Sequence, residues 1–252
     1  MSKYSREFGC EFEFSSSFHK VAKIARKAIG KVYGGNSLRV KDDWYSSVNN
    51  KRWHMKTDAS TDCELATPVS SYPDLNKIFK VISFLKKSGE VKVSKRDAFH
   101  VHINAKDISP DKLIVAWIQM EKIFSMCFPS HRRNNTHYCA HLLHRYRKND
   151  TLAKYFKYAF EESTQHHVIF SLHHYEARKT VEFRICEGTL DTELIQHLIR
   201  FYMSFLDYAK KFDATMTACE EKSISKINDL FNVIEVPYST ETFLIKRFRK
   251  FS

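Results

Sequence analysis

Several short stretches of the chain alternate apolar with polar residues, the pattern typical of strands that have one buried face and one polar face. The predicted strands lie within residues 8–14, 99–104, 168–174 and 181–186. Residues 51–68 predict a hairpin, because two such runs flank a polar turn and Pro68 ends the pairing. On the polar face of 181–186, Glu182 and Arg184 point the same way.

Helical periodicity fills most of the intervals between these strands. Apolar residues three and four positions apart predict helices with one buried face, and Ser, Pro and Gly residues mark their ends. The predicted helices run from Phe18 to Gly34, from Pro73 to Gly89, from Leu113 to Phe128, from Leu152 to Phe160 and over 192–213, with one or two more in 214–252, broken at Val236-Pro237. This order predicts an α+β fold with a largely antiparallel sheet and helices packed on one face.

Composition indicates a soluble globular protein. Apolar residues make up 43% of the 252, no run approaches 18 apolar residues, and the first residues contain no apolar signal region. The six cysteines contain no Cys-x-x-Cys pair, so we expect buried thiols in a reducing compartment. The expected location is the cytoplasm, with no membrane contact.

A formal charge of +12 favours anionic ligands, which include nucleotides, nucleic acids and acidic proteins. The bases cluster twice along the chain, at Arg132, Arg133, Arg145, Arg147 and Lys148, and at Lys246, Arg247, Arg249 and Lys250. The second cluster lies beside Phe243, Phe248 and Phe251, a mixture that suits a surface for nucleic-acid backbone and stacked bases. The alternative for both clusters is ordinary solvated surface.

The polar faces of the predicted strands hold most of the candidate chemistry. They carry Glu11, Glu13, Glu64, His100, His102, Glu182 and Arg184. If these strands are neighbours, the carboxylates repel one another unless a cation compensates them, and Mg²⁺ or Mn²⁺ suits such ligands. The alternative is solvated strand faces with cross-strand ion pairs and satisfied core histidines.

The chain has no P-loop, no dinucleotide-binding glycine pattern and no protein-kinase motif. If it uses ATP, the sheet itself must bind the nucleotide. A tract from His131 to His144 contains four histidines and Cys139, but its spacing matches no compact zinc pattern.

Four segments, taken together and in order, resemble the core motifs of the amidoligases, a family in the carboxylate–amine ligase superfamily of glutamine synthetase and glutamate–cysteine ligase. The segments are Phe-Gly-Cys-Glu11-Phe-Glu13-Phe, Lys-Thr-Asp58-Ala-Ser-Thr-Asp-Cys-Glu64-Leu-Ala-Thr-Pro68, His100-Val-His102-Ile and Thr-Val-Glu182-Phe-Arg184-Ile-Cys-Glu-Gly-Thr-Leu-Asp191. Arg133 to Cys139 resembles a further segment of the family. The resemblance covers roughly residues 6–205.

The resemblance implies a glutamine-synthetase-like sheet and an ATP- and Mg²⁺-dependent ligase that forms an amide through an acyl phosphate. The implied metal ligands are Glu11, Glu13, Glu64, His100 and Glu182. His102 would lie against the nucleotide, Arg184 would stabilise the transferring phosphoryl group, and Asp58 would hold the amine and take its proton. Arg133, or Arg132 in its place, would be a second anion contact.

We expect an amidoligase-like catalytic domain over 1–213 and a basic helical extension over 214–252 packed on it. Ala98 departs from the family, which has glycine before His-x-His. The amine and carboxylate substrates are small molecules or groups on a peptide, protein or nucleic acid. Two other functions stay open: a nucleic-acid-binding protein on a ligase-like scaffold, and a metal-dependent nuclease that uses the same acids.

Overall fold

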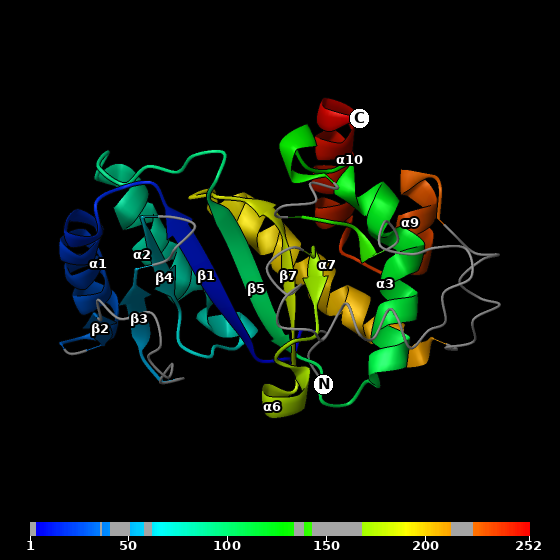
Figure 1. The fold of residues 1–252 in the computed structure, drawn as a ribbon, viewed down its shortest axis with the longest axis horizontal. Coiled ribbons are helices and arrows are strands. Elements are labelled where there is room, and N and C mark those ends of the chain that lie inside the picture. Colours follow the sequence, from blue (N-terminus) through cyan, green and yellow to red (C-terminus); the bar gives the residue numbers. More distant parts are fainter. Residues whose placement is uncertain are drawn as a thin grey trace. The chain divides into compact units, whose positions relative to one another are not determined.

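The computed structural model describes residues 4–35, 37–40, 51–57, 62–133, 139–142, 168–212 and 224–252. Strands and helices are mixed along this part of the chain, as the sequence patterns predict (Figure 1). They divide into two compact units, Met1–His102 with Cys186–Gln196 and Ile103–Ile185 with His197–Ser252. The predicted division into a catalytic domain over 1–213 and an extension over 214–252 is not the same as this one, and it remains a prediction.

The strands form one sheet in the order β2-β3-β4-β1-β5-β7-β6. They are β1 (Phe8–Phe14), β2 (Leu38–Val40), β3 (Trp53–Lys56), β4 (Cys63–Ala66), β5 (Ala98–Asn104), β6 (Phe170–Ser171) and β7 (Thr180–Glu187). The predicted α+β class is confirmed. The likeness to a glutamine synthetase sheet stays a prediction.

The prediction of a largely antiparallel sheet is wrong, because the sheet is mixed. Strand β2, which the sequence did not predict, pairs in parallel with β3. A parallel pair needs a crossover of about a dozen residues, and the chain has twelve, 41–52, between these two strands. The predicted hairpin of β3 and β4 is confirmed as an antiparallel pair.

In the first unit, strand register separates an apolar face from a polar face. Phe12 of β1 lies opposite Leu65 of β4, and Leu65 lies opposite Met55 of β3, so the three side chains share a face. The rings of Phe12 and Phe99 are 5.0 Å apart, which places Phe99 of β5 on that face too. Because side chains alternate along a strand, the neighbouring residues of each strand form the polar face.

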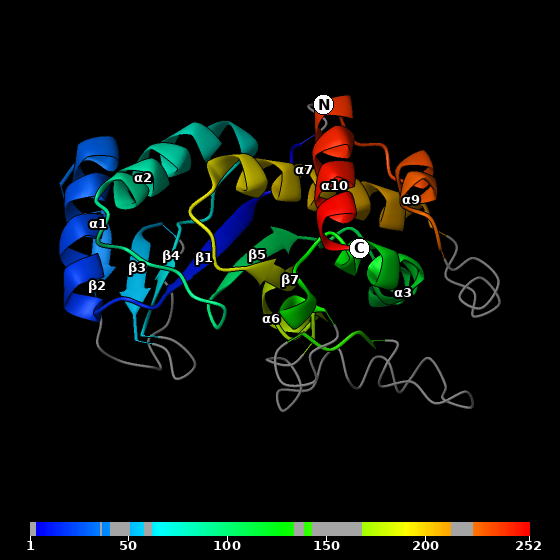
Figure 2. The ribbon, with the colours of Figure 1, turned by 90° about the horizontal axis from the view of Figure 1, so that it is seen from above.

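Two helices cover the apolar face of the first unit, α1 (Phe18–Tyr33) and α2 (Leu75–Lys87). Figure 2 shows α2 over the strands with α1 beside it. The ring of Tyr33 lies 5.8 Å from Trp53, which shares the face of Met55. The buried stripe of α1, close to the predicted one, is Val21, Ala22, Ala25, Ala28 and Ile29.

Helix α1 begins and ends where the sequence predicts, and α2 lies inside the predicted range Pro73 to Gly89. Gly34 follows α1 with φ of 81°, a left-handed value that favours glycine. Helix α2 follows the short 3₁₀ helix η1 (Tyr72–Asp74), where Ser71 and Asp74 form a reciprocal capping box and Pro73 occupies the first turn.

The second unit has an aromatic core around Trp117 of α3 (Pro110–Ser125). The Trp117 ring centroid lies between 4.9 and 5.9 Å from those of Phe124, Phe170, Phe183 and Phe205. Phe205 belongs to α7 (Thr192–Lys211), which confirms the predicted long helix. The described residues of this unit also form the short elements η2 (Ser130–Arg132) and α6 (Tyr175–Arg178).

The described residues 224–252 form α9 (Ile227–Val233) and α10 (Tyr238–Phe251), which confirms the predicted break at Val236-Pro237. Helix α10 packs within the second unit: Arg247 Nε donates to the carbonyl of Cys127 at 3.0 Å, and His197 Nδ1 lies 3.0 Å from Thr240 Oγ1. The helix predicted over 152–160 lies outside the described residues.

The five cysteines within the described ranges are buried thiols, as predicted, and Cys219 lies outside those ranges. Burial raises the pKa of Cys63 and Cys127 to about 12, so both are protonated near neutral pH. Of the helices in the described ranges, none is long and apolar enough to cross a membrane.

Candidate functional site

The polar face of the first unit brings together five predicted site residues: Glu11, Glu13, Glu64, His100 and His102. Register explains the grouping on β1, β3 and β4, since Glu13 lies opposite Glu64, and Glu64 lies opposite Lys56. The carboxylates of Glu13 and Glu64 are buried, at 5% and 3% exposure. Two buried acids directly opposite each other destabilise a sheet unless other groups compensate their charge.

Each of these two acids has a compensating group within the unit. The backbone N–H of Ala98 donates to Glu13 Oε2 at 2.7 Å. Lys56 Nζ lies 3.1 Å from Glu64 Oε1. Ala98, the residue that departs from the family glycine, therefore lies where its main chain fixes the Glu13 carboxylate at the start of β5.

The imidazoles of β5 face the carboxylates of β1. His100 Nδ1 is 3.5 Å from Glu11 Oε2, and His100 Nε2 is 3.8 Å from Glu13 Oε1. His102 Nε2 is 3.3 Å from the other oxygen of Glu11. Both oxygens of Glu11 and one oxygen of Glu13 are thus directed at ring nitrogens, a set of donors of the kind that binds divalent cations.

The protonation of Glu11 follows from two opposed effects. Burial disfavours the charged carboxylate and by itself raises its pKa, but the charge of His102 and hydrogen bonds from His100 and His102 outweigh burial. The pKa of Glu11 is therefore held well below the ordinary glutamate value of 4.5. Glu11 is an anion near neutral pH and is ready to act as a metal ligand.

A buried aspartate holds the backbone next to this face. Asp97 is fully buried, and its two carboxylate oxygens accept hydrogen bonds from Ser15 Oγ at 2.9 Å and from the N–H of Ser94. Its carbonyl accepts the N–H of Gly188 at 2.7 Å. A Cβ at Gly188 would lie 2.6 Å from Asp97 Cβ, so only glycine fits this close approach.

In the second unit, the polar face of β7 carries Glu182 and Arg184 as an ion pair between Glu182 Oε1 and an Arg184 Nη. Glu182 is buried, at 5% exposure, and lies opposite Ser171 of β6. His174 also contributes a ring nitrogen within 4.8 Å of a Glu182 oxygen. This unit thus places a carboxylate, an imidazole and a guanidinium close together.

The two predicted anion-binding arginines contact backbone carbonyls. The buried guanidinium of Arg132 donates to the carbonyls of Ile185 at 3.2 Å and Arg184 at 2.7 Å, so it holds the backbone of β7. The guanidinium of Arg133 donates to Phe128 at 2.7 Å and to Phe251. The predicted role of both arginines in anion binding stays a prediction.

Asp58, the predicted base, lies outside the described residues, as do His137 and His144 of the histidine-rich tract. Sequence reasoning missed Lys56 and His174. Lys56 could have been found by drawing the hairpin register, because any tight pairing that places Glu64 on the polar face also places a β3 residue opposite it. His174 precedes a four-residue helix, and nothing in its sequence context marks it.

Comparison with known proteins adds a family. Residues 4–206 match a family model described as "Putative amidoligase enzyme". A search of curated proteins finds no match. Among solved structures, a bifunctional glutathione synthetase from Pasteurella multocida is similar over 98% of this chain and 47% of that chain, with 12% identity and a TM-score of 0.42. The chain spans about half the length of that protein.

Proposed function

Because the chain belongs to the amidoligase family, we propose that it is an ATP- and Mg²⁺-dependent ligase that joins a carboxylate to an amine. The observation that carries the proposal is the polar strand face of the first unit. There, the half-buried carboxylate of Glu11 and the buried carboxylate of Glu13 lie within 4 Å of imidazoles, inside the range that matches the family model. These acids and imidazoles are the ligand types that a divalent cation prefers, and a metal-bound triphosphate would bring such a cation to them.

The donor set fits Mg²⁺, with Mn²⁺ as the alternative, because carboxylate oxygens with an occasional imidazole suit a hard divalent ion. We assign Glu11, Glu13, Glu64 and His100 of the first unit and Glu182 of the second as ligands. When bound, the metal would neutralise phosphate oxygens of ATP.

The guanidinium of Arg184 is assigned to the transferring phosphoryl group. Its ion pair with Glu182 fixes its orientation, and fixed positive charge lowers the barrier because it needs no rearrangement as negative charge develops. The bonds from Arg132 to the carbonyls of residues 184 and 185 position this strand. His102 is assigned to the nucleotide, and Arg132 and Arg133 are assigned to further anion contacts.

The proposed reaction has two steps. An oxygen of the substrate carboxylate attacks the terminal phosphorus of ATP, and the bond to ADP breaks, giving an acyl phosphate and ADP. The amine nitrogen then attacks the acyl carbon, phosphate leaves with the electrons of the broken C–O bond, and the nitrogen loses a proton. Asp58 is assigned to hold the amine and accept that proton.

The test is ADP release from the purified protein with ATP, Mg²⁺ and pools of amines and carboxylates. We expect ADP to form only with both substrates present, and to be lost in Glu182→Ala and Arg184→Ala proteins whose circular dichroism is unchanged. The matched controls are Glu193→Ala and Arg178→Ala, exposed residues of the same types.

Two results would count against the ligase. One is calorimetry that detects no nucleotide binding with Mg²⁺ present. The other is cleavage of DNA or RNA with Mg²⁺ alone, lost in the Glu182→Ala protein, which would indicate a nuclease.

A further inference from the structure

Helices α1 and α2 carry charge of one sign on their exposed side. Helix α1 contains five lysines and arginines and α2 contains four, and neither helix contains an acidic residue. All of these bases are exposed. They form a surface that we call the basic helix layer, made of Lys20, Lys23, Arg26, Lys27, Lys31, Lys77, Lys80, Lys86 and Lys87.

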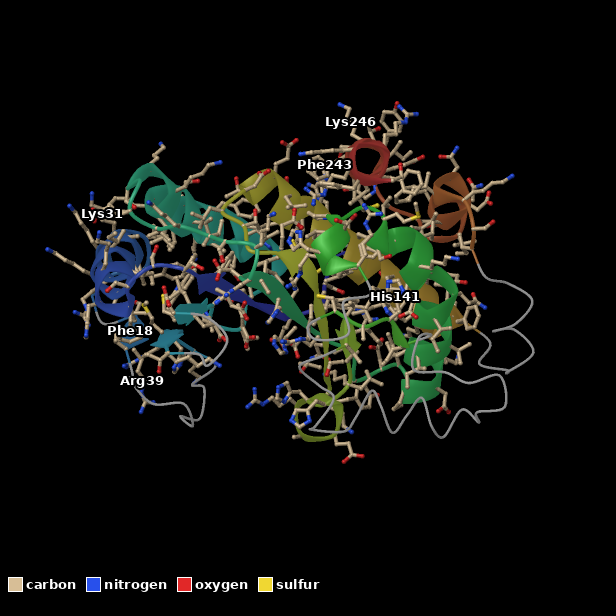
Figure 3. The ribbon with its side chains drawn as sticks, turned by 45° about the horizontal axis from the view of Figure 1, so that its top comes forward. Phe18, Lys31, Arg39, His141, Phe243 and Lys246 are labelled. Carbon is tan, nitrogen blue, oxygen red and sulfur yellow. The ribbon has the colours of Figure 1, made fainter. Side chains whose placement is uncertain are left out.

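The spacing within each helix arranges these bases in rows. Steps of three and four residues keep Lys20, Lys23, Lys27 and Lys31 along one side of α1, about 4.5–6 Å apart along the axis. Lys31 Nζ of α1 lies 5.1 Å from the centre of the Phe84 ring of α2, so the two helices are neighbours on this side. Figure 3 shows Lys31 on the outer side of α1.

Few acids neutralise this layer. Among the described residues, ion pairs reach only Lys20, to Glu90 at 3.4 Å, and Lys77, to Asp74 at 3.7 Å. Both pairs are exposed, and such pairs contribute little. The basic clusters that the sequence suggested behave differently, because the guanidinium groups of Arg132, Arg133 and Arg247 donate to backbone carbonyls.

We propose that the basic helix layer binds nucleic acid through its phosphodiester backbone, without reading sequence. Regular rows of lysine match a repeating line of phosphates, and lysine interacts with phosphate as a point charge without selecting a base. The layer lies on the side of α1 and α2 away from the strands, and the polar face lies on the other side of those strands. Binding there therefore does not depend on the ligase activity.

The surface suits two other classes of partner less well. Protein interfaces are depleted in lysine and need apolar anchors at their centre, and membrane-surface helices insert apolar side chains. In the described ranges, the large apolar side chains with high exposure are Val69, Val93, Val233 and Tyr238, none of which is on α1 or α2.

The test uses fluorescence anisotropy of the full chain with labelled duplex DNA, duplex RNA and single-stranded DNA of mixed sequence. For duplex DNA, we expect the logarithm of the binding constant to fall linearly with the logarithm of salt concentration. The triple variant Lys23→Glu, Arg26→Glu, Lys27→Glu should bind at least ten-fold more weakly. Its salt slope should be smaller by about 0.9 for each phosphate that the variant no longer neutralises.

The matched control is Lys246→Glu, Arg249→Glu, Lys250→Glu on α10, which changes net charge equally and alters three exposed bases. It should retain most of the affinity. The proposal is overturned if the α10 variant loses binding and the α1 variant does not, if both lose it equally, or if the wild-type protein binds none of the three nucleic acids. It is also overturned if anionic vesicles or polyglutamate bind the layer more tightly than nucleic acid does.

Discussion

The first unit carries two charged surfaces on opposite sides of the same strands, and they treat charge in opposite ways. On the polar face, each carboxylate of Glu11, Glu13 and Glu64 has a nitrogen within 4 Å. On the basic helix layer, two of the nine bases have an acid within that distance among the described residues. The charges of the polar face are compensated by neighbouring groups, whereas the exposed bases of the basic helix layer together produce a positive electrostatic field.

Burial explains this difference. A charge removed from water loses hydration worth several kcal/mol, so it persists only beside a partner in fixed geometry. An exposed lysine keeps its hydration and needs no partner. Buried charges therefore determine where a ligand's atoms must lie, whereas exposed charges of one sign determine which molecules approach. The following predictions test this distinction, beginning with the largest effect.

Glu11→Gln should lower Mg²⁺-dependent ADP formation by about 100-fold or more, because it removes one anion from the proposed metal site and keeps the side chain's size. Binding of nucleic acid to the basic helix layer should be unchanged. Glu7→Gln, an exposed acid near the start of β1, is the control. Full activity of the Glu11→Gln protein would show that the polar face has no catalytic role.

Gly188→Ala should destabilise the protein by about 1–3 kcal/mol, because the new Cβ would lie 2.6 Å from Asp97 Cβ beside the polar face. Gly30→Ala in α1 has no atom within 4 Å of its new Cβ and should stabilise by about 0.5–1 kcal/mol, since alanine favours a helix. Urea denaturation measures both changes. Equal changes in unfolding free energy for the two variants would show that the backbone near Asp97 moves to accept the new Cβ without loss of stability.

The same substitution on the two surfaces gives a direct comparison. Lys56→Met leaves the buried Glu64 without its 3.1 Å ion pair and should destabilise by about 1–2 kcal/mol. Lys27→Met on the basic helix layer should change stability by less than about 0.5 kcal/mol. If Glu64 is a metal ligand, Mg²⁺ with ATP should raise the melting temperature of the Lys56→Met protein more than that of the wild type. Similar unfolding free energies for the two variants would contradict the distinction between compensated and uncompensated charge.

The last prediction concerns Asp74, the acid at the start of α2. Hydrogen bonds from the side chain and backbone of Ser71 lower the pKa of Asp74 below its ordinary value of 3.8. A lowered pKa means that the carboxylate stabilises the fold above that ordinary value, and that this contribution is lost as pH falls through the lower, folded-state pKa. The difference in unfolding free energy between wild type and Asp74→Asn should be about 0.5–1 kcal/mol at pH 7 and should vanish at low pH. A difference that does not change with pH would rule out the carboxylate as its source, and Ser71→Ala should reduce the same pH dependence.

The elements that the sequence predicted share a local signal. The alternation that gives β1, β5 and β7 lies within each strand, and the caps of α1 and α2 lie within a few residues of the helix ends. Strand β2 has three residues, too few for a pattern. The direction of its pairing depends on the path between strands, which residue types do not encode, and so the mixed sheet was missed.

The residues of the candidate site that belong to sequence motifs could be predicted, and those outside the motifs could not. Glu11, Glu13, Glu64, His100 and His102 meet on one face because alternation and register agree. Lys56 needed the register of the hairpin, and His174 has no motif. The sequence drew attention to Arg132 and Arg133 because they are adjacent, and both donate to backbone carbonyls. The α1 lysines are spaced apart in sequence and form one surface only once the helix is drawn.

The hydrogen bond from the Ala98 main chain to Glu13 has a consequence for mutational scanning. Its donor is present in every amino acid except proline, so replacing the side chain at position 98 leaves the anchor in place. A scan that exchanges side chains would score this position as tolerant within the space available, although the orientation of the Glu13 carboxylate depends on it. An amide-to-ester replacement at the peptide nitrogen of residue 98, made by chemical synthesis, would reveal the dependence.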